Sequence, residues 1–545
     1  MPVLQLRHSL QGGGEYQLIA YCKTIEPFRP LNQFVIQDDS TKDEILCYTA
    51  QVMDDTDVII IGAGVAGLTC GCLLAKRGLK VLIAEKNPKV GGCCTSFQKD
   101  GFSFALSVQS IGECQRGGRI WRFLKELGLL DQIRFIPLEP AREYHFPDRR
   151  VKQSSNLDTH IETLSSLFQD EKEGIKQVYE VLARIYEEFS QIPSSLNWFD
   201  TSLFSSKYPF LYQYREKTYG DLLNEWISNP FLKTLLSIRS SYALLPPEEI
   251  SVVGMAGIEM SYFKHGVSCI EGKVEELPLK MGEALSKLGG HILKGDAASK
   301  ILTEEKNAIG VRLKNGQEVR GKAIISNIDA YTTFMDLVGE DSLPIGFLSK
   351  LRGLRPSLSY FILYLGIEGG LEELSLSNNE VFFDNNLLKE YQALYENQIS
   401  DDASFYLLAP SKVNPTHAPK GRSTLCLSYK VPYHLSPNWG KETKEHLFQR
   451  LVAEASAFIP DLKKRILVSV ETTPKTIERW THNRWGAAYG WAQIPSQSGI
   501  HRLQRTTPFQ NLYLTGHWTS PGGGISGVVA SGELTAEAVL GSLQS

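Results

Sequence analysis

Residues 57–92 read DVIIIGAGVAGLTCGCLLAKRGLKVLIAEKNPKVGG, and this stretch decides the fold of the chain. The apolar run Val58–Ile61 predicts a strand, a helical pattern follows it, and a second apolar strand, Val81–Ala84, ends on Glu85. Between the first strand and the helix stands a G-x-G-x-x-G turn. In this strand–turn–helix–strand context, the turn predicts a dinucleotide-binding βαβ unit within an α/β fold.

The glycines of this turn predict how a pyrophosphate is bound. Gly62 permits the tight turn, Gly64 lets a pyrophosphate approach the backbone, and Gly67 lets the helix pack closely on the strand. The helix begins near Val65 and Ala66, where free N–H groups and the positive end of the helix dipole would face the phosphates. We therefore expect these five residues to contact the cofactor.

The residues around Glu85 indicate which dinucleotide is bound. Glu85 lies 18 residues beyond Gly67 (85 − 67), close to the spacing at which an acidic side chain accepts hydrogen bonds from an adenosine ribose. Lys86 follows, and then the pair Gly91-Gly92. A Gly-Gly pair at this place resembles the extended fingerprint of large FAD-containing oxidoreductases, where the backbone supports the adenosine diphosphate. An ordinary surface turn is the alternative, and the position after Glu85 favours FAD.

The other end of the chain supplies a second cofactor signal. Residues 511–533 read NLYLTGHWTSPGGGISGVVASGE, in which a short apolar strand precedes Gly516 and a glycine turn precedes a small-residue helix. The helix N-terminus at Gly523, Gly524 and Ile525 would meet a ligand at close range. A flavin ring suits it, because the helix dipole would stabilise the negative charge of reduced flavin. The alternative is a glycine turn before a packing helix.

Taken together, these stretches resemble the phytoene desaturase, carotenoid isomerase and retinol saturase group of flavoproteins, from about residue 57 to about residue 541. The matches continue in three internal stretches: residues 262–290, 310–329 and 473–490. The first leads to a second nucleotide-contacting strand, where Ala298 is expected to contact the cofactor. The resemblance implies bound FAD, a Rossmann-like FAD-binding fold of the glutathione reductase type, and a lipophilic polyene as substrate.

The resemblance also implies an order of domains. It predicts an intertwined substrate domain and a helical, aromatic-rich cap inserted into the FAD-binding domain. The predicted parts are an appended segment of unknown role at 1–55, FAD-binding parts at 56–153, 263–335 and 501–545, a helical cap at 154–262, and a substrate-domain sheet at 336–500.

Departures from the family pattern leave the substrate and the direction of the reaction open. Cys93 follows Gly92 where the family often has arginine, and Ala105 and Ser107 replace an acid and a glycine. Gly516 is followed by His517, where related flavoproteins often carry an aspartate that holds the ribityl chain. The resemblance places Cys93 and Cys94 near the cofactor, which makes them candidates for a redox or covalent role, whereas Cys70 and Cys72 on the first helix are expected to be small buried apolar residues.

Composition limits the partners. A chain of 545 residues should form two or three lobes, and its net charge of −4 offers no field that recruits nucleic acid. No apolar run reaches the roughly 18–20 residues of a membrane-spanning helix. Nine scattered cysteines fit no zinc spacing, so we expect no metal. An odd number of cysteines without an export signal favours the cytoplasm. The expected partner is a hydrophobic small molecule, and the oligomeric state stays open.

An aromatic-rich stretch has two interpretations. It is either a lid over an apolar substrate site that also touches a membrane surface, or the core of a helical cap that follows a helix predicted over 161–192. The residues concerned are Trp198, Phe199, Phe204, Tyr208, Phe210, Tyr212, Tyr214 and Tyr219. We expect residues 196–242, the strand 357–367 and residues 480–491 to line one apolar cavity. In that strand, Tyr360 and Tyr364 should share one face and Phe361 the other.

Three functions remain open at this point. The first is an FAD-dependent desaturase, saturase or isomerase acting on C–C or C=C bonds of a polyene. The second is a flavin amine oxidase, which an aromatic pair at the flavin would favour, and the candidates for such a pair are Trp480, Trp485, Tyr489, Trp491 and Trp518. The third is a non-catalytic escort resembling GDP-dissociation inhibitors. The catalytic residues stay unassigned, although His517 is a candidate proton handler.

Overall fold

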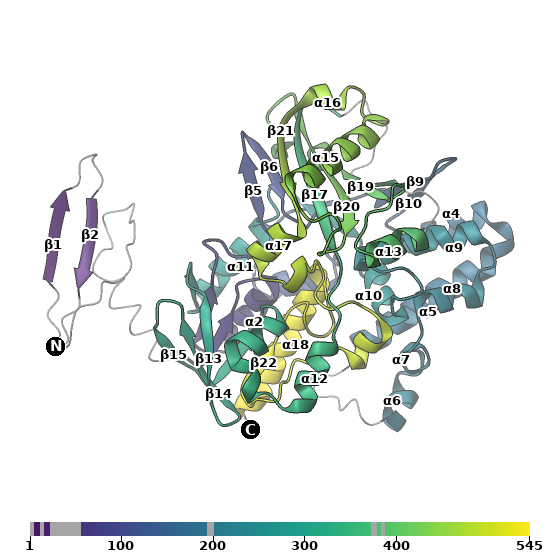
Figure 1. Ribbon diagram of the computed structural model, residues 1–545. Helices are drawn as coiled ribbons and strands as arrows, with labels where there is room; N and C mark the ends of the chain where they lie inside the picture. Colours follow the sequence, from purple (N-terminus) through teal and green to yellow (C-terminus); the bar gives the residue numbers. More distant parts are fainter. Residues whose placement is uncertain are drawn as a thin grey trace. The chain divides into compact units, whose positions relative to one another are not determined.

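A five-stranded parallel sheet contains the strands of both predicted cofactor-binding stretches. Figure 1 labels the strand of the C-terminal stretch, β22 (Leu512–Leu514). The order of the sheet is β12 (His291–Lys294), β4 (Val81–Glu85), β3 (Val58–Ile61), β16 (Ala323–Ser326) and β22. All four pairings are parallel. Strands β3, β4, β16 and β22 are buried throughout, as expected for apolar strands covered on both faces. Their carboxyl ends share one edge, which brings the two predicted cofactor stretches together.

The computed structural model describes residues 5–10, 16–21, 56–192, 201–371, 379–382 and 387–544. The chain divides into two compact units, residues 1–55 and residues 56–545. In the first unit, β1 (Gln5–Leu10) and β2 (Tyr16–Tyr21) form an antiparallel pair. The sequence of this segment predicts short strands at residues 16–21, 34–37 and 45–49. The first is confirmed, and the other two ranges lie outside the described residues.

Two helices pack closely against this parallel sheet. α2 (Val65–Lys76) follows β3, and α18 (Ile525–Gln544) lies against it. A β-carbon on Gly67 would stand 2.3 Å from the Gly62 carbonyl oxygen, and one on Gly532 would stand 2.7 Å from the Ala66 carbonyl oxygen. Only glycine therefore allows α2 to approach the turn before it and α18 to approach α2.

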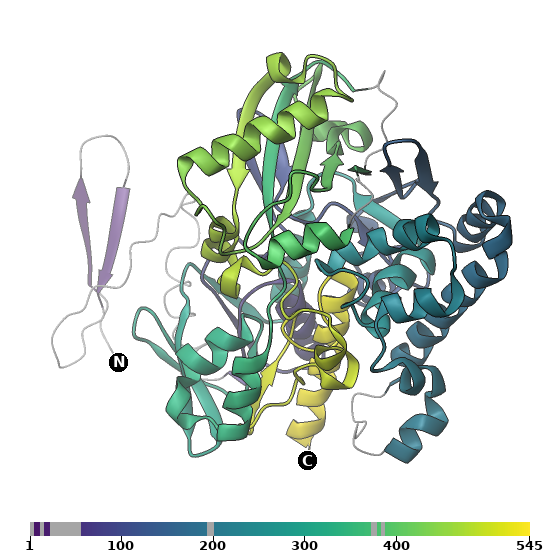
Figure 2. The same cartoon turned by 45° about the vertical axis from the view of Figure 1, so that its right-hand side comes forward.

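A seven-stranded mixed sheet forms the second layer (Figure 2). Its order is β10 (Arg150–Gln153), β9 (Arg142–His145), β18 (Asn379–Phe382), β19 (Phe405–Leu408), β20 (Arg422–Val431), β17 (Ser359–Glu368) and β21 (Ile466–Thr472). Phe361 of β17 lies in the core under α15 (Lys441–Ser456). Tyr360 and Tyr364 belong to the opposite cluster, so their predicted sharing of one face is confirmed.

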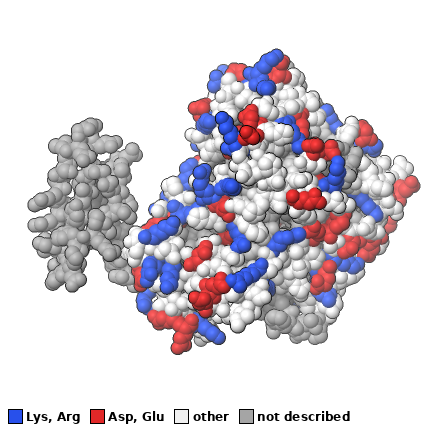
Figure 3. All heavy atoms as spheres, in the orientation of Figure 1, with Lys and Arg blue, Asp and Glu red and all other residues white. Residues whose placement is uncertain are grey.

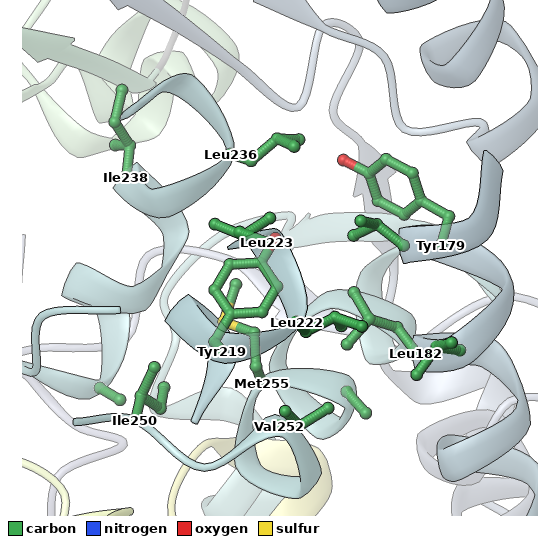
Figure 4. Packing of buried hydrophobic residues seen from close by; sticks show 14 of the residues in the cluster. Tyr179, Leu182, Tyr219, Leu222, Leu223, Leu236, Ile238, Ile250, Val252 and Met255 are labelled. Carbon is green, nitrogen blue, oxygen red and sulfur yellow. The ribbon is translucent and has the colours of Figure 1, made fainter. Parts of the chain in front are cut away.

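The helical part is built on one large apolar core (Figure 4). The predicted helix over 161–192 is two helices, α4 (Leu157–Leu167) and α5 (Lys172–Ser190), with a 3-10 turn at Gln169–Glu171 between them. The remaining helices of this part are α6 (Thr201–Lys207), α7 (Pro209–Tyr214), α8 (Tyr219–Trp226), α9 (Pro230–Ser237) and α10 (Val252–Phe263). Figure 4 shows Tyr219 among Leu222, Leu223 and Met255.

The aromatic-rich stretch belongs largely to that core. Phe204, Tyr208, Tyr214 and Tyr219 are each at most 5% exposed. These four residues therefore support the core interpretation, and give no support to a lid or a membrane contact. Trp198 and Phe199 lie outside the described residues. Across the part of the chain that is described, no helix is both long and apolar enough to span a bilayer.

The surface seen in Figure 3 carries basic and acidic side chains side by side, without a large patch of one sign.

Smaller elements complete the fold. The remaining strands are β5 (Ser96–Lys99), β6 (Phe102–Ala105), β7 (Ile111–Gly112), β8 (Phe135–Pro137), β11 (Val267–Ile270), β13 (Ala298–Glu304), β14 (Asn307–Leu313) and β15 (Glu318–Arg320). The remaining α-helices are α3 (Arg119–Glu126), α11 (Glu276–Lys287), α12 (Ile345–Gly353), α13 (Leu387–Tyr395), α14 (Pro410–Val413), α16 (Leu462–Arg465) and α17 (Pro474–Thr481).

Candidate active site

A cavity of about 820 Å³, called the central cavity below, begins at the carboxyl edge of the parallel sheet and reaches the mixed sheet. Thirteen of the fourteen residues predicted to bind the cofactor line it. They are Gly62, Gly64, Val65, Ala66, Glu85, Lys86, Gly91, Gly92, Ala298, Gly516, Gly523, Gly524 and Ile525. The exception is Gly67, which packs against the turn instead.

The turn before α2 is shaped to receive a ligand. Gly62 has φ +97°, which favours glycine, and Gly64 caps the helix in an extended conformation without a side-chain cap. The first N–H groups of α2 therefore remain available to an anion. Asn327, just beyond β16, supports the turn by donating its amide to the Gly62 carbonyl over 3.1 Å. A β-carbon on Gly64 would stand 2.8 Å from that amide nitrogen, so this backbone must stay bare.

The carboxylate of Glu85 is fixed at the same edge. One oxygen accepts the Ala63 N–H at 2.7 Å and the other accepts the Asn87 N–H at 2.8 Å. These bonds hold the carboxylate at the cavity wall, where its remaining lone pairs can meet a ribose hydroxyl. Beside it, Lys86 donates to the Arg479 carbonyl over 3.1 Å, and burial lowers the pKa of its amine to about 8.

The C-terminal stretch forms the opposite wall. The Gly516 N–H donates to Ser531 Oγ over 2.9 Å, and a β-carbon on Gly516 would lie 2.6 Å from the amide oxygen of Asn327. Gly523 and Gly524 then lead into Ile525, the first residue of α18. A second helix N-terminus therefore meets the central cavity, as the sequence predicted. Asn327 joins both glycine stretches, although sequence reasoning did not include it among the site residues.

His517 lines the cavity next to Gly516. Burial and the nearby Arg502 guanidinium lower the pKa of the imidazole to about 3. The neutral imidazole can therefore accept or donate a hydrogen bond at physiological pH, but it carries no proton to give as a cation. This gives no support to a role as a general acid.

The thiols beside the glycine pair are protonated. Cys93 lines the cavity, and burial raises the pKa of its thiol to about 11. Cys94 is buried and donates to the Val274 carbonyl over 3.5 Å, and burial raises its pKa as well. Because the thiolate is the reactive form, neither cysteine is poised for redox chemistry. Among the described residues, no group of three His, Cys, Asp or Glu side chains is arranged to hold a metal.

The rest of the cavity wall is largely aromatic and aliphatic. Six tyrosines contribute to it: Tyr186, Tyr242, Tyr262, Tyr360, Tyr406 and Tyr489. Aliphatic and aromatic side chains of α5, α10, β17 and β19 join them: Ile185, Phe189, Val253, Ile258, Ile362 and Leu408. The prediction that residues 196–242 form this wall is wrong for all described residues except Tyr242. The aromatics of that segment pack into the helical core, and α5 and α10 face the cavity instead.

Of the five candidates for an aromatic pair, only Trp480 and Tyr489 line the cavity. Trp480 donates to the Gly92 carbonyl over 3.4 Å, whereas a β-carbon on Gly523 would stand 3.0 Å from the Tyr489 ring. The two residues therefore contact different parts of the wall. Trp491 and Trp518 are buried against each other with ring centres 4.7 Å apart, and Trp485 is 39% exposed.

The residues present fit FAD. Bare glycine backbone and a helix N-terminus stand at one wall, a fixed carboxylate stands beside them, and a second helix N-terminus stands at the other wall. FAD, when bound, supplies hydride or electron transfer to or from carbon. The protein's own part is to orient the reactants and to exclude water from the apolar wall.

Comparisons with known proteins agree with this geometry. The model of the family described as flavin containing amine oxidoreductase matches residues 65–540. All-trans-retinol 13,14-reductase of Danio rerio is 26% identical, over 90% of this chain and 87% of the relative. The 4,4'-diapophytoene desaturase (4,4'-diapolycopene-forming) of Methylomonas sp is 25% identical, over 88% of this chain and 94% of the relative.

A solved structure of putrescine oxidase bound to putrescine has a similar fold, with a TM-score of 0.61 at 16% identity, and covers 89% of this chain and 99% of that protein. At this identity the likeness concerns the fold alone. The predicted α/β fold with a Rossmann-like FAD-binding sheet is confirmed, as is the resemblance to the retinol saturase and carotenoid desaturase group. The chain belongs to the flavin-containing amine oxidoreductase family and is an FAD-dependent oxidoreductase of that family.

Proposed function

We propose that the protein is a desaturase, saturase or isomerase that uses FAD to act on C–C or C=C bonds of an apolar, polyene-like substrate. The observation that carries the proposal is the wall of tyrosines and aliphatic side chains beyond the glycine turns of the central cavity. A long apolar molecule must shed its water before it reacts, and such a wall replaces the water without demanding charge.

The tyrosines of this wall suit an apolar substrate. Burial raises the pKa of Tyr360, Tyr406 and Tyr489 well above the ordinary value, so their hydroxyls stay protonated and neutral. Their rings offer flat apolar surface, and their hydroxyls offer a few hydrogen bonds. Relatives named for retinol and for diapophytoene act on molecules of this kind, which supports the same substrate class here.

The cofactor site is built from three separate FAD-binding segments of the chain. FAD is held by the thirteen cavity-lining residues named above, with Gly67 allowing the close packing of α2, and these residues come from the segments 56–153, 263–335 and 501–545. Glu85 binds the adenosine ribose, the α2 N-terminus binds the pyrophosphate, and the α18 N-terminus faces the flavin ring. Asn327 is added as the residue that holds the two glycine stretches in register.

Oxidation of an amine is the second candidate, because the family takes its name from that reaction and Tyr489 lines the cavity. A non-catalytic escort role is less well supported, because both glycine stretches that would hold the flavin are intact.

A binding experiment separates these candidates. The FAD-loaded protein is titrated with all-trans-retinol and with putrescine while the visible spectrum of the flavin is recorded. A polyene enzyme changes its flavin spectrum saturably with retinol and not with putrescine. The reverse result supports amine oxidation, and a protein purified without flavin supports the escort role.

A further inference from the structure

Two tyrosines of the cavity wall stack on two buried arginines. The guanidinium carbon of Arg142, on β9, lies 4.5 Å from the ring centre of Tyr242 and 5.4 Å from that of Tyr262. The guanidinium carbon of Arg239 lies 4.6 Å and 4.5 Å from the same two ring centres. Tyr242 and Tyr262 line the central cavity. The wall is therefore apolar on its surface and cationic directly behind it.

The charges behind the wall do not cancel. Arg239 is paired with Glu259 at 3.1 Å, and both side chains are 3% exposed. Arg142 is 1% exposed, and no carboxylate of the described residues lies within ion-pair distance of it. Two arginines and one glutamate leave one positive charge. A buried charge without a counter-charge is costly, because the protein interior does not replace the water that would solvate it.

The guanidinium of Arg142 also lacks hydrogen-bond acceptors. Its Nε and one terminal nitrogen, Nη1, have no partner among the described residues, and neither has Nη1 of Arg239. The Ser240 hydroxyl, next to Arg239 in the chain and fully buried, has none either. Buried donors are almost always satisfied by protein, water or ligand. None of these three residues lines the central cavity, so a ligand there meets the tyrosine rings, and the feature that reaches it is the uncompensated charge of the arginines stacked on those rings.

His160, which lies beside the two arginines, adds no further positive charge to the cluster. It lies close enough for the two arginines to act on it, and together with burial they lower the pKa of its imidazole to about 3. The ring is therefore neutral at physiological pH, and its Nε2 shares a hydrogen bond with the Tyr179 hydroxyl at 2.9 Å. The second oxygen of Glu259 has no donor in the described residues, but its charge is already counted against Arg239.

We infer that the substrate is an apolar molecule bearing a carboxylate, and that this carboxylate is bound at the Tyr242–Tyr262 wall with Arg142 as its counter-charge. The inference rests on the proposed function, since it names the polar end of that apolar substrate. The tyrosine hydroxyls are the donors at the cavity surface, and the Tyr262 hydroxyl already shares a hydrogen bond with Ser110 at 3.3 Å.

The charge of the wall selects among end groups. A monocarboxylate brings the single negative charge that the arginine cluster lacks, and hydrogen bonds to a charged group are the stronger kind. A diphosphate brings more negative charge than the cluster balances. A protonated amine is repelled, because the uncompensated charge behind the wall has the same sign.

Three related retinoids test the inference in the FAD-loaded protein. All-trans-retinoic acid, its methyl ester and all-trans-retinol share one polyene and differ at the end group. Their dissociation constants are measured by quenching of protein fluorescence. The acid should bind about tenfold or more tightly than the ester or the alcohol, the worth of a charge-assisted hydrogen bond. Arg142→Met, which keeps length and removes charge, should abolish the preference, and Arg142→Lys should keep part of it.

A matched control lies on the same hairpin. Arg149 is exposed and stacks 4.5 Å from the ring centre of Phe231, away from the cavity wall. Arg149→Met therefore removes an arginine and a ring contact, and should leave the preference for the acid unchanged. If Arg142→Met does not fold or does not retain flavin, the variants Tyr242→Phe and Tyr262→Phe test the carboxylate site instead. Each removes one hydroxyl donor and keeps the ring, and at least one should weaken binding of the acid but not of the ester.

The outcomes separate the two proposals. If the FAD-loaded protein binds all three retinoids equally, the carboxylate inference fails and the proposed function stands. An unchanged preference in Arg142→Met, or tighter binding of geranylgeranyl diphosphate than of the acid, also overturns the inference alone. If the protein retains flavin and binds none of the retinoids, the proposed function fails and the inference fails with it.

Discussion

Arg502 donates its guanidinium to the backbone carbonyl of His517 over 2.6 Å, beside the glycine turn that leads into α18. The same guanidinium donates to three further carbonyls, those of Thr519 at 2.8 Å and of Trp491 and Gln497 at 3.3 Å. A β-carbon on Gly522 would stand 3.4 Å from its central carbon. One buried cation thus holds the tryptophan pair against the segment that follows β22, and that segment forms one wall of the central cavity.

Arg502→Met should destabilise the protein strongly. Burial lowers the pKa of the guanidinium to about 9, which still leaves it charged near neutrality. Its removal leaves four carbonyls without this donor, three of them in buried hydrogen bonds, and each buried carbonyl costs about 1–3 kcal/mol when unsatisfied. A loss of at least about 3 kcal/mol is therefore expected in urea denaturation. Arg422, the exposed first residue of β20, is paired with Glu368 at 3.3 Å and is the control. Arg422→Met should cost less than about 1 kcal/mol, and equal losses in the two variants would contradict this account of Arg502.

Gly64→Val should remove the cofactor without unfolding the protein. The Gly64 backbone is extended, so valine fits its dihedral angles, but the new β-carbon would stand 2.8 Å from the Asn327 amide and occupy the place of the pyrophosphate. The measurement is flavin released per chain after heat denaturation. Gly541→Val is the matched control, because no atom lies within 4 Å of its β-carbon position. A normal flavin content in Gly64→Val would end the assignment of this turn.

Glu85→Ala should weaken FAD binding by about 1.5–3 kcal/mol, the worth of hydrogen bonds to a charged group, which is roughly 10- to 150-fold in the dissociation constant. The carboxylate also accepts hydrogen bonds from the Ala63 and Asn87 N–H groups. Because Glu85→Gln keeps one oxygen, its dissociation constant for FAD should lie between those of Glu85→Ala and wild type. Titration of the flavin-free protein with FAD measures both. An unchanged dissociation constant in Glu85→Ala would exclude Glu85 as the ribose acceptor.

Asp329 should make stability depend on pH. Burial raises the pKa of this carboxyl to about 7. Hydrogen bonds from the Arg484 N–H at 2.6 Å and the Tyr331 N–H at 2.7 Å lower the pKa, but by less than burial raises it. Because the pKa in the folded protein lies above the unfolded value of 3.8, the contribution of Asp329 to the free energy of unfolding is present in full below about pH 4. This contribution is lost as the pH rises to about 7.

The free energy of unfolding of wild type relative to Asp329→Asn should therefore fall with rising pH in this window, by up to about 1.4 kcal/mol per pH unit. Urea denaturation of both proteins at a series of pH values measures this difference. A difference that stays constant between about pH 4 and 7 would show that Asp329 is ionised in the folded protein throughout.

Local patterns made the cofactor end predictable. The spacing of Gly62, Gly64 and Gly67 and the acid at Glu85 are properties of one βαβ unit, which the sequence contains whole. Asn327 could not be predicted as a site residue, because its role depends on β16 ending at the same sheet edge as β3. That pairing joins segments far apart in the sequence. The cavity wall was misassigned for the same kind of reason. Aromatic residues signal burial, but tertiary packing decides whether they face a core or a cavity.

The arginine cluster could not be predicted at all. Arg142 and Arg239 lie on a strand and a 3-10 turn far apart in sequence, and nothing in their neighbours shows that both stack on Tyr242. Nor does the sequence show which arginine lacks a carboxylate. Only the fold reveals that Glu259 pairs with Arg239 and leaves Arg142 uncompensated.

The most direct test of the account is the identity of the product. FAD-loaded protein, with its flavin oxidised in one sample and photoreduced in another, is incubated without oxygen with all-trans-retinol and with putrescine, and the products are analysed by chromatography and mass spectrometry. The account predicts a polyene that has lost or gained two hydrogens, or that keeps its mass with an altered double-bond geometry, and unchanged putrescine. A polyene left intact with either form of the flavin, together with conversion of putrescine to an aldehyde, would contradict it.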